Sequence, residues 1–102
     1  MASLLVLYKT PKDTAPFDKY YFETHVPIAK KIPGLRKYEV SHGPVATPAG
    51  LSGVHLVANL HFDDIAAVQS AFASAEGQAA GADLQNFATG GADILLLDTR
   101  EV

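Results

Sequence analysis

Residues 53–62, GVHLVANLHF, alternate more strictly than any other part of the chain, and this alternation constrains the fold most. Every second position is apolar or aromatic: Val54, Leu56, Ala58, Leu60 and Phe62. The positions between them are mixed: His55, Val57, Asn59 and His61. Because successive side chains of a strand point to opposite faces of the sheet, the first series is expected to face a core. The second series is expected to lie on the opposite face of the sheet, which does not pack against that core.

The segments around this strand predict the topology. Residues 3–8 and 92–98 are apolar on both faces and predict buried strands, and residues 35–43 predict a strand with one solvated face. Residues 14–31 and 63–88 have apolar side chains at helical spacing, with the stretch after residue 76 weakened by Gly77 and Gly81. The order strand, helix, strand, strand, helix, strand predicts a ferredoxin-like α+β fold, a four-stranded antiparallel sheet with both helices on one face.

A proline interrupts the first predicted helix. Pro27 has no N–H group and disfavours the helical conformation at Val26, so a break is expected at His25 and Val26. Backbone carbonyls freed by such a break would hold one ring nitrogen of His25 and set its tautomer. His25 then either serves a ligand or merely fills the kink. Residues 43–53, rich in proline and glycine, predict a connecting loop that could also act as a lid, with His42 in solvent.

Length and composition narrow the class of protein. A chain of 102 residues has room for one core, so residues 1–102 are expected to form a single domain. The net charge of -3 gives no reason to expect nucleic acid, and the absence of cysteine excludes disulfides and thiolate catalysis. No apolar run approaches the roughly 18 residues of a membrane span, and the amino-terminal residues read as a strand, so a cytoplasmic protein is expected.

Metal and cofactor sites are not predicted. His55 and His61 are six residues apart on the predicted strand, a separation of roughly 20 Å that prevents them from binding one metal ion. The chain has no phosphate-binding glycine loop, no dinucleotide fingerprint and no nucleophile elbow.

Two helices cover only one face of four strands, so we expect the uncovered face to pack against a partner. Large aliphatic side chains of residues 4–8 and 94–97 would be exposed there beside the mixed series of residues 53–62. Face-to-face pairing around a two-fold axis would bury them, which predicts a homodimer. A space left between the two sheets would be apolar with scattered His, Asn and Tyr groups, as in a small-molecule pocket, and we expect it to take a small apolar ligand within reach of His25.

Residues 17–40, FDKYYFETHVPIAKKIPGLRKYEV, and the tail FATGGADILLLDTREV that starts at Phe87 resemble the EthD-domain family. The family is named after a component of ethyl tert-butyl ether degradation and belongs to the dimeric α+β barrel superfamily. The resemblance implies the homodimeric barrel. It also implies a place among cofactor-free isomerases, cyclases, decarboxylases and monooxygenases of bacterial metabolism. A muconolactone-type isomerase is similar through the same stretch, and its site histidine and tyrosine match His25 and Tyr38. The cysteine that it also uses has no counterpart here.

These observations give six candidate site residues. His25 can accept and return a proton near neutral pH, and the Tyr38 hydroxyl can donate to a developing oxyanion, although a strand tyrosine can equally be packing. Phe17 and Tyr21 are candidates for substrate contact at the pocket mouth, or are simply core. His55 and His61 either line the cavity or are polar surface.

Three functions are compatible with these residues. The first is a cofactor-free acid–base enzyme acting on a small apolar carbonyl, lactone or phenolic compound. The second is a non-catalytic protein that binds a hydrophobic metabolite or assists a degradative oxidase. The third is a monooxygenase, including the haem-degrading type.

Overall fold

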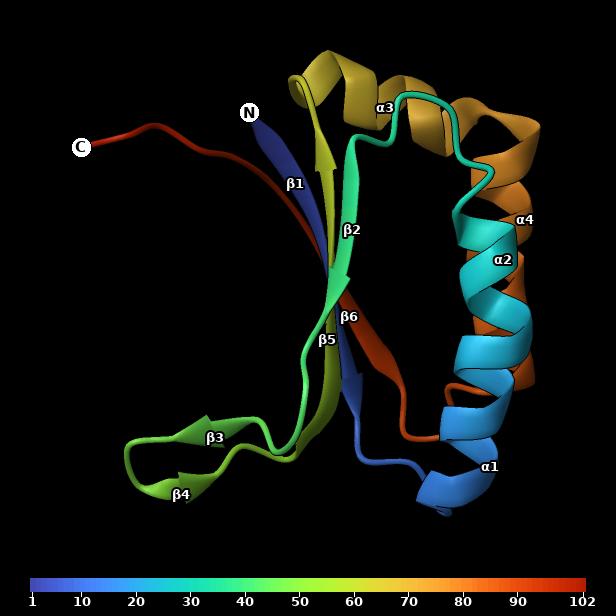
Figure 1. Cartoon of the computed structure of the whole chain (residues 1–102), viewed down its shortest axis with the longest axis vertical. Coiled ribbons are helices and arrows are strands. Elements are labelled where there is room, and N and C mark those ends of the chain that lie inside the picture. The colour runs from blue at the N-terminus through green and yellow to red at the C-terminus, as the bar shows by residue number, and fades with distance from the viewer.

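The computed structural model describes residues 1–102 and consists of a four-stranded antiparallel sheet with all its helices on one face (Figure 1). In chain order the elements are β1 (Ala2–Lys9), α1 (Thr14–Tyr20), the π-helix η1 (Tyr21–His25), α2 (Val26–Ala29), β2 (Lys37–Val40), β3 (Ala46–Thr47), β4 (Gly50–Leu51), β5 (Val54–Phe62), α3 (Ile65–Ala73), α4 (Ala75–Asp83), the 3-10 helix η2 (Leu84–Asn86) and β6 (Ala92–Asp98). The strand order is β2-β5-β1-β6, and every neighbouring pair is antiparallel. The predicted ferredoxin-like α+β fold is confirmed.

The core lies between the helices and the even-numbered residues of β1 and β5. Leu56, Ala58, Leu60 and Phe62 are buried on this side, as the alternation predicts. Tyr8 pairs directly with Leu56 and shares its face, so a tyrosine enters the core from the end of β1.

The predicted helix break at His25 and Val26 is wrong. Val26 has φ −56° and ψ −47°, which is helical, and the chain continues from α1 through η1 into α2 without interruption. The Val26 N–H bonds to the carbonyl of Tyr21, five residues back, so one turn is widened into a π-helix instead. Pro27 then occupies the first turn of α2, where a missing N–H is tolerated.

The second helical segment is divided at Ser74, a division that the helical spacing of its apolar residues does not predict. Ser74 has an extended backbone, ends α3, and accepts a hydrogen bond from the Gly77 N–H to cap α4. Asp64 caps α3 through the Ala67 N–H, whereas Asp63 pairs with Arg36. None of the helices has the length and apolar character needed to cross a membrane.

A bulge at the start of β5 changes the direction of one candidate side chain. Tyr8 pairs with Leu56 but Lys9 pairs with Val54, so His55 is an extra residue on β5. Its ring turns towards α1, where Nε2 lies 2.7 Å from Asp18 Oδ1. The expectation that His55 shares a face with His61 is therefore wrong.

The other face of the sheet has no helical cover (Figure 1). The strand registers place Leu5, Leu7, Val57, Leu95 and Leu97 on this face. The edge strand β6 is also partly exposed on the helix-covered face of the sheet, since Ile94 and Leu96 are 40% and 44% exposed. The β3–β4 hairpin, within the predicted loop of residues 43–53, projects on the uncovered side of the sheet.

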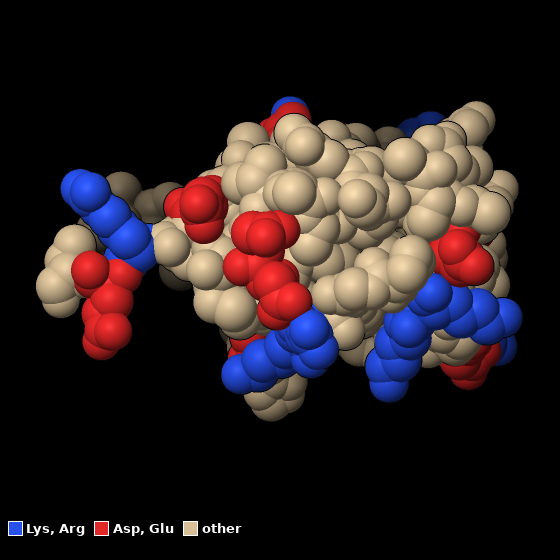
Figure 2. Space-filling view, turned by 90° about the horizontal axis from the view of Figure 1, so that it is seen from above, with Lys and Arg blue, Asp and Glu red and all other residues tan.

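The surface charge is mixed on the face seen in Figure 2. Acidic and basic side chains lie beside one another at the margins of a largely uncharged area, without one continuous basic patch. This distribution agrees with the net charge of -3.

Candidate active site

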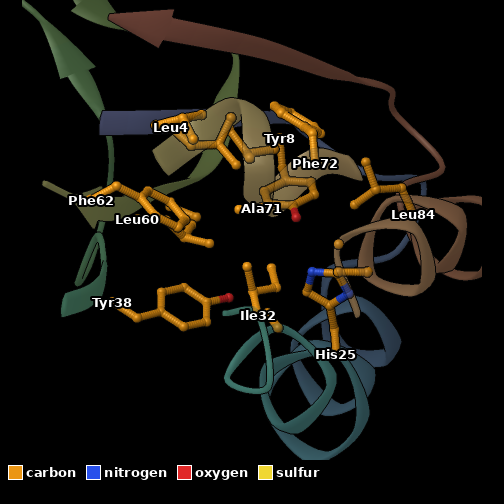
Figure 3. A pocket seen from close by; sticks show the side chains of 16 residues that line it. Leu4, Tyr8, His25, Ile32, Tyr38, Leu60, Phe62, Ala71, Phe72 and Leu84 are labelled. Atoms are coloured by element: carbon orange, nitrogen blue, oxygen red, sulfur yellow. The ribbon is translucent and has the colours of Figure 1, made fainter. Parts of the chain in front are cut away.

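A small apolar pocket lies between the sheet and the helices (Figure 3). Its volume is about 60 Å³, and 14 of its 16 lining residues are hydrophobic. His25, Tyr38 and Tyr8 are among the polar-tipped members of the lining, and their rings point into the same space in Figure 3. The pocket is thus on the helix-covered side of the sheet, and the expectation that His25 reaches a cavity between two sheets is wrong.

His25 is held by a carboxylate rather than by freed backbone carbonyls. Its Nδ1 lies 2.9 Å from Asp83 Oδ2, and both side chains are buried. His25 comes from the π-helix η1, and Asp83 is the last residue of α4. Helix packing between α2 and α4 therefore brings together two residues that are 58 positions apart.

The Asp83 carboxylate has three donors around it. Its Oδ1 accepts hydrogen bonds from the Tyr20 hydroxyl at 2.6 Å and from Asn86 Nδ2 at 2.9 Å, while Oδ2 faces His25. Burial raises the pKa of Asp83, but the hydrogen bonds from Tyr20, Asn86 and His25 outweigh burial and hold its pKa below the ordinary value. Asp83 is therefore an anion at neutral pH and can only accept at both oxygens.

This anion determines the tautomer of His25. Since Asp83 only accepts, Nδ1 carries the proton, and Nε2 presents its lone pair. Burial lowers the pKa of His25 below 6.5, and the attraction of Asp83 only partly opposes burial, so the ring is neutral at pH 7. Nε2 makes no hydrogen bond in the chain, and the only fully enclosed side-chain oxygen or nitrogen without a partner is Asn59 Oδ1. Nε2 therefore borders open space, which is the pocket.

Three tyrosines supply hydroxyls near this nitrogen. The Tyr38 hydroxyl lies 2.5 Å from that of Tyr21, whereas the buried Tyr8 hydroxyl has no hydrogen-bond partner and points into the pocket. Burial raises the pKa of Tyr8, Tyr21 and Tyr38, so all three remain protonated at neutral pH and can donate.

The structure brings some of the six candidates together and separates others. His25 and Tyr38 line one pocket, and Tyr21 is bonded to Tyr38 at its edge. Phe17 is buried in the aromatic core, and His55 meets its ring edge-on at 5.0 Å, outside the pocket. His61 is on the uncovered face of the sheet, 2.8 Å from Glu39.

Tyr8 and Asp83 belong to the site but were not predicted from the sequence. Tyr8 ends an apolar strand, where a single tyrosine is easily taken for packing. Asp83 is the one acidic residue on the buried face of α4, which otherwise carries Gly77 and Ala80. An acidic residue at helical spacing from small buried residues was the available signal.

No group of three or more His, Asp or Glu residues is close enough to hold a metal ion. The arrangement of His25, Asp83 and the tyrosines is capable of proton transfer and hydrogen-bond donation at an apolar surface.

Comparison with known proteins agrees with this architecture. Residues 9–91 match the family model for the EthD domain. A Rhodococcus erythropolis protein, named as an uncharacterized 11.0 kDa protein in the thcB-thcC intergenic region, is 34% identical over 102 residues, covering 100% of this chain and 98% of the relative. The crystal structure of an EthD family protein from Bacillus halodurans has a TM-score of 0.89 at 36% identity, over 98% of this chain and 99% of that chain.

More distant solved structures share the fold alone. The cofactor-independent oxygenase SnoaB from Streptomyces nogalater has a TM-score of 0.68 at 14% identity, over 99% of this chain and 94% of that chain. A dimeric ferredoxin-like protein from Thermobifida fusca has a TM-score of 0.68 at 12% identity, over 96% of this chain and 90% of that chain. The match over residues 9–91, together with two relatives above 30% identity along the whole chain, establishes that this protein belongs to the EthD domain family.

Proposed function

We propose that this protein is a homodimeric acid–base enzyme that needs no bound cofactor and acts on a small apolar carbonyl, lactone or phenolic compound. The observation that carries the proposal is the buried pair of His25 and Asp83. It leaves one imidazole lone pair facing an apolar pocket that also holds the hydroxyls of Tyr8 and Tyr38.

His25 is the proton carrier in this proposal. Nε2 takes a proton from a carbon next to a carbonyl, or from a phenolic oxygen, and returns it at another position of the same molecule. Asp83 is a positioning residue, because it fixes the Nδ1–H tautomer and stabilises the imidazolium that forms.

The tyrosines stabilise the charge that this transfer creates. Removing a proton next to a carbonyl places negative charge on the carbonyl oxygen. The Tyr8 hydroxyl points into the pocket without a partner, so it can donate to that oxygen without first breaking a bond. Tyr38 can donate as well, once it exchanges its bond to Tyr21 for the substrate.

The surroundings favour this chemistry over hydrolysis. The pocket is small and mostly apolar, so few water molecules compete for the His25 lone pair. Because burial lowers the His25 pKa, the ring is in its basic form at neutral pH. The same burial strengthens the attraction between an oxyanion and a tyrosine hydroxyl.

The test is His25→Gln, assayed against a panel of small lactones, enolisable ketones and phenols. The amide can still donate to Asp83 but cannot carry a proton, so turnover should fall by about 100- to 10,000-fold while the fold is retained. Gln69→Asn, at an exposed position of α3 outside the pocket, is the control and should keep full turnover. An unchanged rate in His25→Gln would refute the catalytic proposal.

One observation favours the alternative of a ligand-binding or auxiliary protein. The pocket volume of about 60 Å³ is well below the roughly 300–1,000 Å³ of a typical small-molecule site, so the pocket alone holds only a small group. Under this alternative, His25→Gln changes ligand affinity only a few-fold and no compound of the panel is turned over.

The homodimer is proposed from the uncovered face. Leu5, Leu7, Val57, Leu95 and Leu97 form an apolar surface there, and a second copy related by a two-fold axis would bury it in a self-complementary contact. The Thermobifida fusca protein of the same fold is described as dimeric.

A further inference from the structure

A second and larger hollow lies on the surface beside the pocket. This groove has a volume of about 550 Å³ and is lined by α1 and η1, by the segment that follows β2, and by the start of β5. Phe22, His42, His55 and Leu56 are the lining residues that matter below. Its volume falls within the range of about 300–1,000 Å³ that is usual for small-molecule sites.

Tyr21 separates the groove from the pocket. Its ring centroid is 5.3 Å from that of Phe22, which lines the groove, and 5.3 Å from that of His25, which lines the pocket. Its hydroxyl reaches across to Tyr38 on β2 at 2.5 Å. Between Phe22 and His25, the Tyr21 ring and its hydrogen bond to Tyr38 therefore lie between the two hollows.

The groove and the pocket are lined on their sheet side by the same face of β5. Leu56 lines the groove and Ala58, two residues further along the same face of β5, lines the pocket. Leu56 also pairs directly with Tyr8, whose hydroxyl points into the pocket. The residue of β5 that lines the groove and the residue that lines the pocket are therefore neighbours on the same face of the strand.

The charges and the aromatic surface of the groove determine which ligands fit it. Asp18 is its only lining residue with a permanent charge, and neither the groove nor the pocket has a lysine or arginine in its lining. The Phe22 ring is 51% exposed and offers a flat apolar surface. The bulge at His55 places the Asp18–His55 pair at the groove, where it can accept from or donate to a hydroxyl.

We propose that the groove and the pocket together form one extended binding site for an elongated, uncharged aromatic compound with a hydroxyl group. One end enters the pocket beside His25, the middle passes between Tyr21 and Tyr38, and the far ring lies on Phe22 within reach of the Asp18–His55 pair. The ligand hydroxyl lies at the end that enters the pocket, where it takes over the hydrogen bond of Tyr38 from Tyr21. This assignment rests on the proposed function for the end that reacts, but the binding itself needs no turnover.

The test uses phenol, 4-phenylphenol and biphenyl-4-carboxylate as probes, with binding followed by NMR of histidine-labelled protein. 4-Phenylphenol should shift the imidazole signals of His25 and His55 with one common Kd. Phenol should bind at least about tenfold more weakly, because it lacks the ring that lies on Phe22. Biphenyl-4-carboxylate has the same length but should also bind more weakly, because no cation in either hollow offsets its charge.

The variant Phe22→Ala distinguishes binding in the groove from binding in the pocket. Because this side chain is half exposed, its loss should leave the fold intact while 4-phenylphenol binds about tenfold more weakly and phenol binds as before. Gln69→Ala, at an exposed position of α3 outside both hollows, should leave all affinities unchanged.

Four results would overturn the assignment. They are shifts at His25 without shifts at His55, equal affinity for phenol and 4-phenylphenol, no effect of Phe22→Ala, or no binding of any probe up to its solubility limit. If the native protein binds 4-phenylphenol but turns over no compound of the panel, the result counts against the proposed function alone, so the two failures are distinguishable.

Discussion

Replacing Asp83 by asparagine tests the central geometry most directly, because the effect can be worked out atom by atom. Asparagine has one carbonyl oxygen and one amide nitrogen in place of two carboxylate oxygens. At Asp83, Oδ1 receives two donors, from Tyr20 and Asn86, whereas Oδ2 receives only His25. The asparagine oxygen therefore stays with Tyr20 and Asn86, and its NH2 group faces His25 Nδ1.

The substitution inverts the tautomer of the histidine. With a donor facing it, Nδ1 must accept, so the ring proton moves to Nε2 and the lone pair no longer faces the pocket. The number of hydrogen bonds is kept, but the bonds from Tyr20, Asn86 and His25 all lose the negative charge of the carboxylate, so we expect the free energy of unfolding to fall by about 1–3 kcal/mol. The rate of turnover should fall by about 100- to 10,000-fold, because the protonated Nε2 that then faces the pocket cannot accept a proton from the substrate.

Nitrogen chemical shifts of the His25 ring provide an assay that needs no substrate. The native protein at pH 7 should show a protonated Nδ1 and an unprotonated Nε2, and Asp83→Asn should show the reverse. Asn86→Ala is the control, because it removes a donor from Oδ1 without touching the His25 contact, and should leave the tautomer unchanged. A native protein with the proton on Nε2, or a variant with unaltered shifts, would refute the reasoning.

Further predictions concern pH, the helix junction and the uncovered face. Burial lowers the His25 pKa below 6.5, so the unfolded chain binds the proton more readily and the free energy of unfolding should decrease as the pH falls below about 6.5; calorimetry should show a smaller decrease in His25→Gln. Gly77→Ala should cost about 1–3 kcal/mol or more in chemical denaturation, because its Cβ would lie 1.9 Å from a backbone carbonyl oxygen of α3. Gly81→Ala meets nothing within 4 Å and should stabilise the helix by about 0.5–1 kcal/mol, so equal effects at the two glycines would contradict this account. Leu95→Asp should convert the proposed dimer to a monomer in light scattering, whereas the exposed Gln69→Asp should not; a native protein that is already monomeric at micromolar concentration would disprove the dimer.

The order of elements and the covered face of the sheet could be predicted because they depend on short-range patterns. The alternation of Val54–Phe62 places Leu56, Ala58, Leu60 and Phe62 in the core, and the observed β6 strand, Ala92–Asp98, has the predicted bounds. Strand periodicity and turn residues act within a few positions, so the sequence contains that information directly.

The conformation at Pro27 could not be predicted from local rules. The residue before a proline avoids the helix in isolation, yet Val26 is helical because a π-turn rearranges the hydrogen bonds ahead of it. The bulge at His55 is similar, since pairing with β1 rather than any local preference decides which way that side chain points.

The sequence by itself determined the strands, the helices and the identity of His25 as a candidate base, because each depends on residues that are close together in the chain. Only the tertiary structure decided which groups surround His25 and which of its ring nitrogens faces the pocket. Its partner Asp83 is 58 residues away, the Tyr8 hydroxyl arrives from another strand, and the tautomer follows from the charge and burial of that assembled set. Hydrogen bonds and desolvation act through space, so helix packing had to be known before the chemistry of the site could be derived.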